Sequence, residues 1–336
     1  KFRAVIPMRG YDGELGSPYR VALYGHGTGG GISDDSFDEQ IAANGIAKVS
    51  MEFGAWNGDD LVWTFQRMLR MNAGVEQSTA MLLHSVVGGY AILQSLDAGL
   101  GDALKADVVD GMENPNAGRE LITADPVWVG GSLGGTMGAI IGTAYPEITT
   151  AVLNVPAGAW THLIPDSLMY ESAMQPVLEA KYGDPIDARM AIAMTQTGWD
   201  DVDGPLWADR AIADGVSFLL QESMGDPVVP NQGTSVLATS LGAQIVGPAL
   251  EPIVGLSEVD EVRGGVGLTQ YRLPDTGVYD VHGFAARSTP AGDAAMEQIF
   301  TFVRSGWDDG TTLVAFPAGC ADVTPEGDCD FTSTFE

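Results

Sequence analysis

Short apolar runs alternate along the chain with longer segments in which apolar residues recur at helical spacing. A run of about four to eight apolar residues is typical of a buried strand, and helical spacing is typical of a helix with one buried face. The apolar runs predict strands at 2–7, 19–25, 46–54, 126–130, 151–158, 216–223 and 266–274. The helical spacing predicts helices at 34–45, 62–71, 78–96, 134–145 and 292–307. This alternation indicates an α/β fold with a mainly parallel central sheet flanked by helices.

Residues 157–215 interrupt the alternation. Helical spacing predicts two helices in this segment, 163–183 and 186–199, with no strong strand between them. We interpret 157–215 as a helical cap inserted into a core, which consists of 1–156 and 216–310. Residues 311–336 then form a C-terminal tail.

The formal net charge of −29 narrows the range of partners. Only 16 of the 336 residues are Lys or Arg, so no basic groove for nucleic acid can be assembled, and anionic lipid surfaces would repel the chain. No apolar run approaches the roughly 20 residues that a membrane span needs. Such acidity is typical of proteins that are highly soluble, or that are adapted to salt or to an extracellular setting.

Two cysteines, Cys320 and Cys329, lie in the tail sequence CADVTPEGDC. Such a close pair predicts a small disulfide-closed loop, and two free thiols are the alternative. The disulfide, together with the acidity, predicts a secreted or cell-envelope protein. The chain opens inside a predicted strand without a signal-peptide pattern, so we expect the sequence to be a mature or trimmed product.

Residues 130–134, Gly-Gly-Ser-Leu-Gly, stand where the pattern changes from strand to helix. A G-x-S-x-G sequence in this context predicts a sharp turn that presents Ser132 as a nucleophile. A phosphate-binding loop would require a lysine that Gly135 and Thr136 do not supply, and a dinucleotide site belongs on the first strand. Ser85 is a rival serine, but it lies within a predicted helix, where a locally bonded hydroxyl is the simpler interpretation.

A serine nucleophile needs a base and an acid that orients the base. Of the four histidines, His282 follows the last predicted sheet strand and precedes the closing helix, which would bring it back over Ser132. Asp226 directly follows a predicted strand and is the best candidate acid. The alternative histidines are His26, His84 and His162, and the alternative acids are Asp203, Asp275 and Asp280.

A second glycine-rich turn, YGHGTGGG, follows the predicted strand 19–25. Such a turn can direct main-chain N–H groups toward developing negative charge, so Thr28 and Leu133 are predicted to form an oxyanion hole. A tight turn without this role is the alternative.

The elbow sequence and the order Ser132, Asp226, His282 resemble the α/β-hydrolase superfamily, in particular its lipases and carboxylesterases. The resemblance covers roughly residues 2–156 and 216–306, although lipase-like elbows usually carry a large residue where Gly131 stands. It implies a serine hydrolase that cleaves small or lipid-like carboxylic esters through an acyl-enzyme, without a cofactor or metal. A serine peptidase or amidase, and a non-catalytic binding protein, are the alternatives.

The cap is rich in methionine and aromatic residues, which suit an adaptable apolar pocket. Trp160, Leu163 and Met174 are the candidate substrate-binding residues. The alternative is that these side chains only pack the underside of the cap. The acidic sequence WDDVDG at 199–204 lacks the spacing of a calcium loop and is interpreted as a solvated turn.

Overall fold

All seven predicted sheet strands lie in one sheet. The structure is a computed structural model that describes residues 1–14, 18–273 and 277–317, without the side chains of residues 278 and 279. Within these residues, nine strands form a sheet in the order β1-β3-β2-β6-β7-β8-β12-β9-β10, parallel except for the β1–β3 pair. The strands are β1 (Arg3–Val5), β2 (Tyr19–Gly25), β3 (Ile46–Met51), β6 (Leu121–Gly131), β7 (Thr150–Asn154), β8 (Ser217–Ser223), β9 (Gln244–Val246), β10 (Glu258–Val259) and β12 (Val266–Tyr271). Two small antiparallel pairs, β4 (Val108–Val109) with β5 (Met112–Glu113) and β11 (Glu261–Arg263) with β13 (Leu313–Ala315), stand apart from it.

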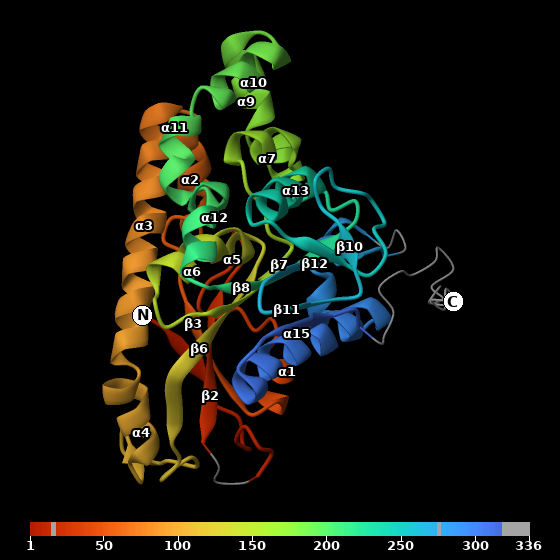
Figure 1. Ribbon diagram of the computed structural model, residues 1–336. Helices are drawn as coiled ribbons and strands as arrows, with labels where there is room; N and C mark the ends of the chain where they lie inside the picture. Colours follow the sequence, from red (N-terminus) through yellow and green to blue (C-terminus); the bar gives the residue numbers. More distant parts are fainter. Residues whose placement is uncertain (15–17, 274–276, 318–336) are drawn as a thin grey trace.

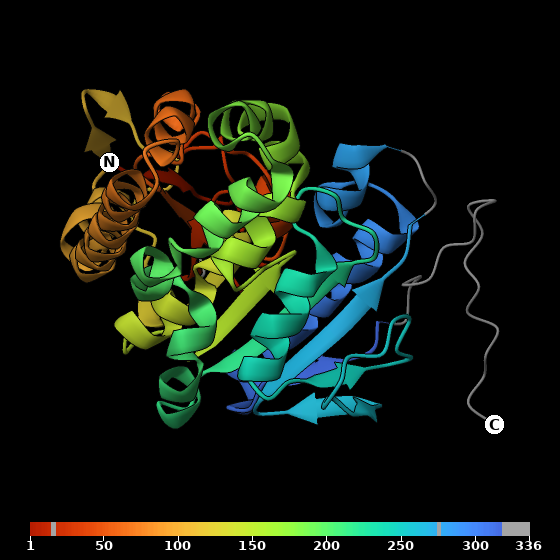
Figure 2. The same ribbon diagram turned by 90° about the horizontal axis from the view of Figure 1, so that it is seen from above.

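Helices cover both faces of the sheet (Figures 1 and 2). The core on one face includes residues of α3 (Asn72–Ser95), α6 (Gly138–Ala144), α12 (Gly204–Ala213) and α13 (Asn231–Ser240). The core on the other face includes residues of α1 (Asp38–Ala43) and α15 (Pro290–Asp309). Neighbouring residues of one strand, such as Leu219 and Leu220, enter opposite cores and are both fully buried. The strands therefore have unbroken apolar sequences, as expected for a parallel sheet buried on both faces. The helices are α1 (Asp38–Ala43), α2 (Leu61–Met68), α3 (Asn72–Ser95), α4 (Asp102–Lys105), α5 (Leu133–Thr136), α6 (Gly138–Ala144), α7 (Trp160–Asp166), α8 (Leu168–Ala173), α9 (Gln175–Tyr182), α10 (Pro185–Ala193), α11 (Gln196–Trp199), α12 (Gly204–Ala213), α13 (Asn231–Ser240), α14 (Val278–His282) and α15 (Pro290–Asp309).

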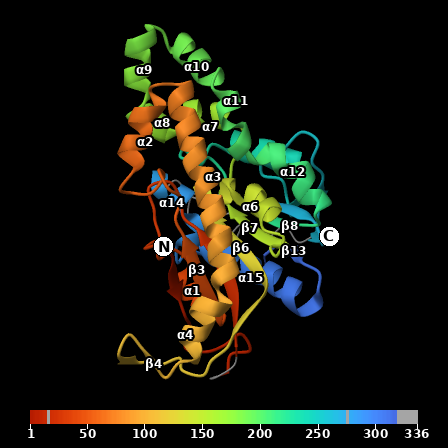
Figure 3. The same ribbon diagram turned by 90° about the vertical axis from the view of Figure 1, so that its left-hand side faces the viewer.

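The segment 157–215 connects β7 to β8 through helices α7 to α12. Helices α9 and α10 extend beyond the sheet, beside α2 and the start of α3 (Figure 3). The Thr79 hydroxyl donates a hydrogen bond to the Gly198 carbonyl at 2.6 Å, which joins α3 to α11. Helix α12 packs instead against α6 and α13. In the view of Figure 3, α2 and the start of α3 therefore lie above the sheet together with helices from the segment between β7 and β8.

The predicted helix at 163–183 is three short helices, α7, α8 and α9. Pro165 lies inside the last turn of α7, and Ser167 adopts an extended conformation that ends it. The Ser167 hydroxyl then caps α8 by accepting a hydrogen bond from the Met169 N–H. Local capping chemistry therefore overrides the apolar spacing that predicted a single helix.

In the described residues, no single helix is long and apolar enough to cross a membrane. One pair bent by 43°, Asn72–Ser95 with Asp97–Lys105, meets the length and composition requirement together. The predicted disulfide between Cys320 and Cys329 lies outside the described residues.

Candidate active site

Ser132 occupies a strained turn between β6 and α5. Its backbone has φ 56° and ψ −114°, a conformation that residues with side chains rarely adopt. A Cβ atom at Gly130 would stand 2.2 Å from the Gly134 carbonyl oxygen, and one at Gly134 would stand 2.0 Å from the Gly25 carbonyl oxygen. Both positions therefore require glycine. A Cβ at Gly131 would meet no atom within 4 Å, so the absence of a side chain there leaves open space next to Ser132.

His282 and Asp226 form a hydrogen-bonded pair. His282 ends the short helix α14, Asp226 follows β8, and the His282 Nδ1 to Asp226 Oδ2 distance is 2.6 Å. The other carboxylate oxygen of Asp226 accepts hydrogen bonds from the Val228 and Val229 N–H groups at 2.8 and 3.0 Å. Three donors thus fix the carboxylate, and His282 keeps its proton on Nδ1 with Nε2 available as a base.

Ser132 and His282 line one cavity. Ser132 lies between β6 and α5, and His282 lies in α14, far later in the sequence. The two side chains meet at the carboxyl ends of the sheet strands. Among the hydrogen bonds of the described residues, none joins the Ser132 hydroxyl to His282. Such bonds are often long in a ligand-free site and shorten when substrate binds.

The turn after β2 runs alongside Ser132. A Cβ at Gly27 would lie 3.2 Å from the Ser132 Cβ, and the Gly134 N–H donates a hydrogen bond to the His26 carbonyl at 3.1 Å. Thr28 and Leu133 consequently line one pocket together with Ser132. Leu133 is the first residue of α5, where main-chain N–H groups have no partner within the helix.

His26 holds this turn in place. Its Nε2 accepts a hydrogen bond from the Phe53 N–H at 2.9 Å, and its Nδ1 donates to the Gly27 carbonyl at 2.7 Å. Burial lowers the pKa of the imidazole, so the neutral form with the proton on Nδ1 is favoured. His26 is therefore a structural residue of the turn that carries Thr28.

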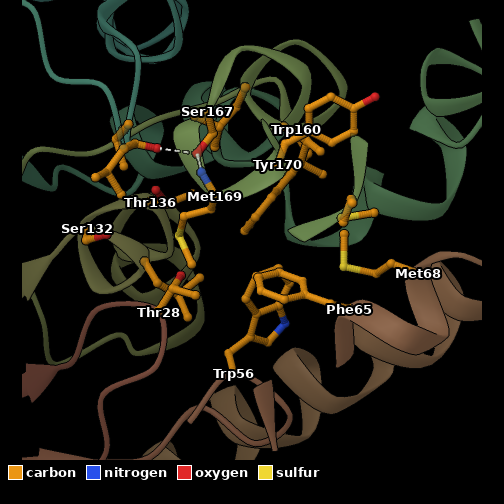
Figure 4. A pocket seen from close by; sticks show the side chains of 16 residues that line it. Thr28, Trp56, Phe65, Met68, Ser132, Thr136, Trp160, Ser167, Met169 and Tyr170 are labelled. Carbon is orange, nitrogen blue, oxygen red and sulfur yellow. Dashed lines mark hydrogen bonds between the residues drawn. The ribbon is translucent and has the colours of Figure 1, made fainter. Parts of the chain in front are cut away.

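A largely apolar pocket extends from Ser132 beneath the cap (Figure 4). We name it the acyl pocket for the role that we propose for it. Ser132 and Thr28 stand at one end and Met68 at the other. It has about 560 Å³ of empty space, part of it open to solvent, and its lining contains no charged residue. The three predicted substrate-binding residues, Trp160, Leu163 and Met174, are all buried and all line it.

Sequence reasoning missed the second wall of the acyl pocket. Trp56, between β3 and α2, and Phe65 and Met68, on α2, face Trp160 and Tyr170 across the pocket (Figure 4). The Trp56 and Trp160 ring centroids are 5.5 Å apart. Trp56, Phe65 and Met68 follow the carboxyl end of β3, and loops at that edge of a parallel sheet surround the site. Their position in the sequence could therefore have indicated that they line the pocket.

Three of the rival residues, Ser85, Asp203 and Asp280, have structural partners elsewhere. The Ser85 hydroxyl accepts a hydrogen bond from the Gly54 N–H and donates one to the Met81 carbonyl. Asp203 is buried, which raises the pKa of its carboxyl, and it accepts hydrogen bonds from the Ala159 N–H and the Gln196 amide. Asp280 pairs with Arg287 at 2.9 Å. His84 and His162 are exposed, and Asp275 lies outside the described residues.

The sheet order, the elbow and the paired His and Asp are arranged as in the α/β-hydrolase fold. No protein-family model and no curated protein sequence matches the chain. Among solved structures, an acylaminoacyl peptidase in complex with Z-Gly-Gly-Phe-chloromethyl ketone is similar, with a TM-score of 0.51 and 13% identity over 95% of this chain and 40% of that chain. The acylaminoacyl peptidase of Pyrococcus horikoshii gives 0.50 and 12% over 91% of this chain and 38% of that chain. Acetyl xylan esterase 1 of a Thermoanaerobacterium species gives 0.43 and 16% over 81% and 76%. The chain thus spans about two fifths of the two peptidases, and the likeness establishes the fold.

Glu222 is a buried carboxylate close to Asp226 in the sequence, and its burial should affect the stability of the fold. It lies near the end of β8, four residues before Asp226, and it is only 1% exposed. Burial raises the pKa of its carboxyl from 4.5 to about 7. The folded state therefore binds this proton more tightly than the unfolded chain does. Below the unfolded pKa the shift does not change the free energy of unfolding, and as the pH rises toward 7 the shift lowers that free energy progressively.

We expect Glu222→Gln to unfold at a higher temperature than the wild type at pH 8 and at nearly the same temperature at pH 4.5. The gain in unfolding free energy at pH 8 should reach about 3 kcal/mol at most. Denaturant unfolding at both pH values measures it, and Glu39→Gln, which removes an exposed carboxylate that does not act on Glu222, is the matched control. A difference that is the same at both pH values would show that Glu222 is not titrating in this range.

Proposed function

We propose that this chain is a serine hydrolase that cleaves carboxylic esters through an acyl-enzyme intermediate. The observation that carries the proposal is the strained backbone of Ser132, next to a cavity that it shares with the Asp226-bound His282. A strained serine at a strand-to-helix turn exposes its hydroxyl, and a histidine held on Nδ1 by a carboxylate is oriented to accept that hydroxyl's proton.

In the proposed reaction, the Ser132 Oγ attacks the carbonyl carbon of the ester while His282 Nε2 takes the hydroxyl proton. The Thr28 and Leu133 N–H groups donate to the tetrahedral oxyanion, an interaction typically worth roughly 3 kcal/mol per donor. The intermediate collapses, the alcohol oxygen leaves with the proton from His282, and the acyl group stays on Ser132. Water then attacks with His282 again as base, which releases the acid and restores the Ser132 hydroxyl.

The acyl pocket favours an apolar acyl group. Its lining is aromatic, aliphatic, sulfur-containing or hydroxyl-bearing, and it offers no charged partner for an ionised substrate group. Amide cleavage is the second candidate, because two structures that resemble this chain with TM-scores of 0.50 and 0.51 are titled acylaminoacyl peptidase. Hydrolysis of p-nitrophenyl butyrate and of butyryl p-nitroanilide tests the choice, since the two substrates differ only in the leaving atom. We expect the ester to be cleaved much faster, and comparable rates on both would favour an amidase.

The cap side of the acyl pocket should set acyl-chain preference. Met174 is 4% exposed and lines the pocket, so Met174→Ala enlarges it. We expect the preference among p-nitrophenyl esters to shift toward longer chains, with the rate on the acetate ester changed by less than about tenfold.

Met194→Ala is the matched control, because Met194 is 76% exposed and is not among the residues that line the acyl pocket. This variant should keep the wild-type chain-length profile. A uniform loss at all chain lengths in Met174→Ala would show that Met174 supports the fold rather than specificity.

A further inference from the structure

Ser132 also lines a second cavity. Ser132 and His282 both contribute to its lining, together with Tyr24, Asp34 and Ser36, and it has about 470 Å³ of empty space, part of it open to solvent. We call it the Asp34 cavity. Ser132 therefore lines two cavities of different chemistry, one largely apolar and one that contains a carboxylate.

Proton transfer decides which half of the substrate enters each cavity. His282 must deliver its proton to the leaving-group oxygen, so the leaving group has to lie against the His282 side chain. Of the described residues, His282 lines the Asp34 cavity and does not line the acyl pocket. Thr28 and Leu133, which would hold the oxyanion, line the acyl pocket. The acyl group therefore belongs beneath the cap and the leaving group belongs in the Asp34 cavity.

The Asp34 carboxylate is held by hydrogen bonds and forms no salt bridge among the described residues. Its oxygens accept hydrogen bonds from the Ser36 N–H at 2.9 Å and the Tyr24 hydroxyl at 3.2 Å. The nearby ammonium of Lys48 bonds the main-chain oxygen of Asp34 and pairs with the carboxylate of Asp38 at 2.7 Å.

Asp38 also pairs with the second nearby cation, Arg3, at 2.7 Å. Both nearby cations therefore pair with Asp38, and among the described residues neither forms a salt bridge with the Asp34 carboxylate. A half-buried carboxylate in such surroundings attracts a cation, and the attraction is stronger there than at a fully solvated site.

We propose that the Asp34 cavity binds the positively charged leaving group of an ester, the ammonium of an amino alcohol, with Asp34 as its counter-ion. The inference rests on the proposed ester hydrolysis, and it names the substrate class of that site. An apolar acid esterified to a cationic alcohol matches both cavities.

Two isosteric esters test this inference. Butyrylcholine carries a quaternary ammonium, and 3,3-dimethylbutyl butyrate replaces the charged nitrogen with carbon. We expect the wild type to prefer the cationic ester by about tenfold in kcat/KM, mainly through KM. The preference should fall as sodium chloride rises from 50 to 500 mM, because exposed charges are screened.

Asp34→Asn keeps an oxygen for the Ser36 N–H and removes the charge. It should lose most of the preference, with about a tenfold fall in kcat/KM for butyrylcholine and less than a twofold change for the neutral ester. Asp35→Asn is the matched control, since it removes an exposed charge one residue away and should change both substrates by less than twofold.

Equal losses on both esters in Asp34→Asn, or an unchanged preference, would overturn the inference. Cleavage of the neutral ester without charge discrimination would refute the role of Asp34 while leaving ester hydrolysis supported. Failure to cleave either ester, together with failure to cleave p-nitrophenyl esters, would refute the proposed function itself.

Discussion

Ser132→Ala is expected to lose ester hydrolysis by a factor of at least about 10⁴ in kcat while it keeps the wild-type fold. The substitution removes the attacking oxygen and nothing else, and alanine has to accept the same φ of 56°. Initial rates on p-nitrophenyl butyrate measure the loss, and circular dichroism with thermal unfolding verifies the fold.

Ser85→Ala is the control for this prediction. The Ser85 hydroxyl is bonded within α3 and to the Gly54 N–H, so its removal should lower stability slightly and leave the rate within a few-fold of wild type. Activity retained in Ser132→Ala and lost in Ser85→Ala would overturn the assignment of the nucleophile.

Asp226→Asn should reduce kcat at pH 7 by about 10⁴-fold with little change in fold, as expected when a triad histidine is held in the wrong tautomer. The asparagine oxygen would remain on the Val228 and Val229 N–H groups, which places the amide nitrogen against His282 Nδ1. Nδ1 must then accept a hydrogen bond, so the proton moves to Nε2, and His282 can no longer act as a base. The pH–rate profile on p-nitrophenyl butyrate measures this loss.

Asp280→Asn is the matched variant, because Asp280 lies two residues before His282 and pairs with Arg287 instead. Its rate should stay within a few-fold of wild type. A large loss in Asp280→Asn with near-normal activity in Asp226→Asn would mean that the acid is misassigned.

The fold was predictable because a parallel sheet buried on both faces leaves a simple pattern in the sequence. Leu219 and Leu220 point into opposite cores, so the strand that carries them is apolar at both positions. The elbow was equally visible, since the glycines at 130 and 134 are required by contacts with backbone atoms. Such steric needs act over a few residues and can be recognised without knowing the rest of the molecule.

The features that were missed depend on contacts between distant segments. The short strands β9 and β10, at one end of the sheet, have three and two residues, too few to leave an apolar run. The acyl pocket takes one wall from Trp56 and α2, and the other from the helices after β7. Asp34 lies about 100 residues before Ser132 in an acidic stretch, where the sequence alone predicts a solvated helix start.

A fluorophosphonate label with peptide mass mapping tests the central claim most directly, because this reagent bonds to an activated serine without requiring a particular ester substrate. We predict a single phosphonate adduct, on the peptide that contains Ser132, formed in wild type, slowed strongly in Asp226→Asn and absent in Ser132→Ala. An adduct on any other serine, or a wild-type protein that hydrolyses esters while Ser132 stays unlabelled, would contradict the account.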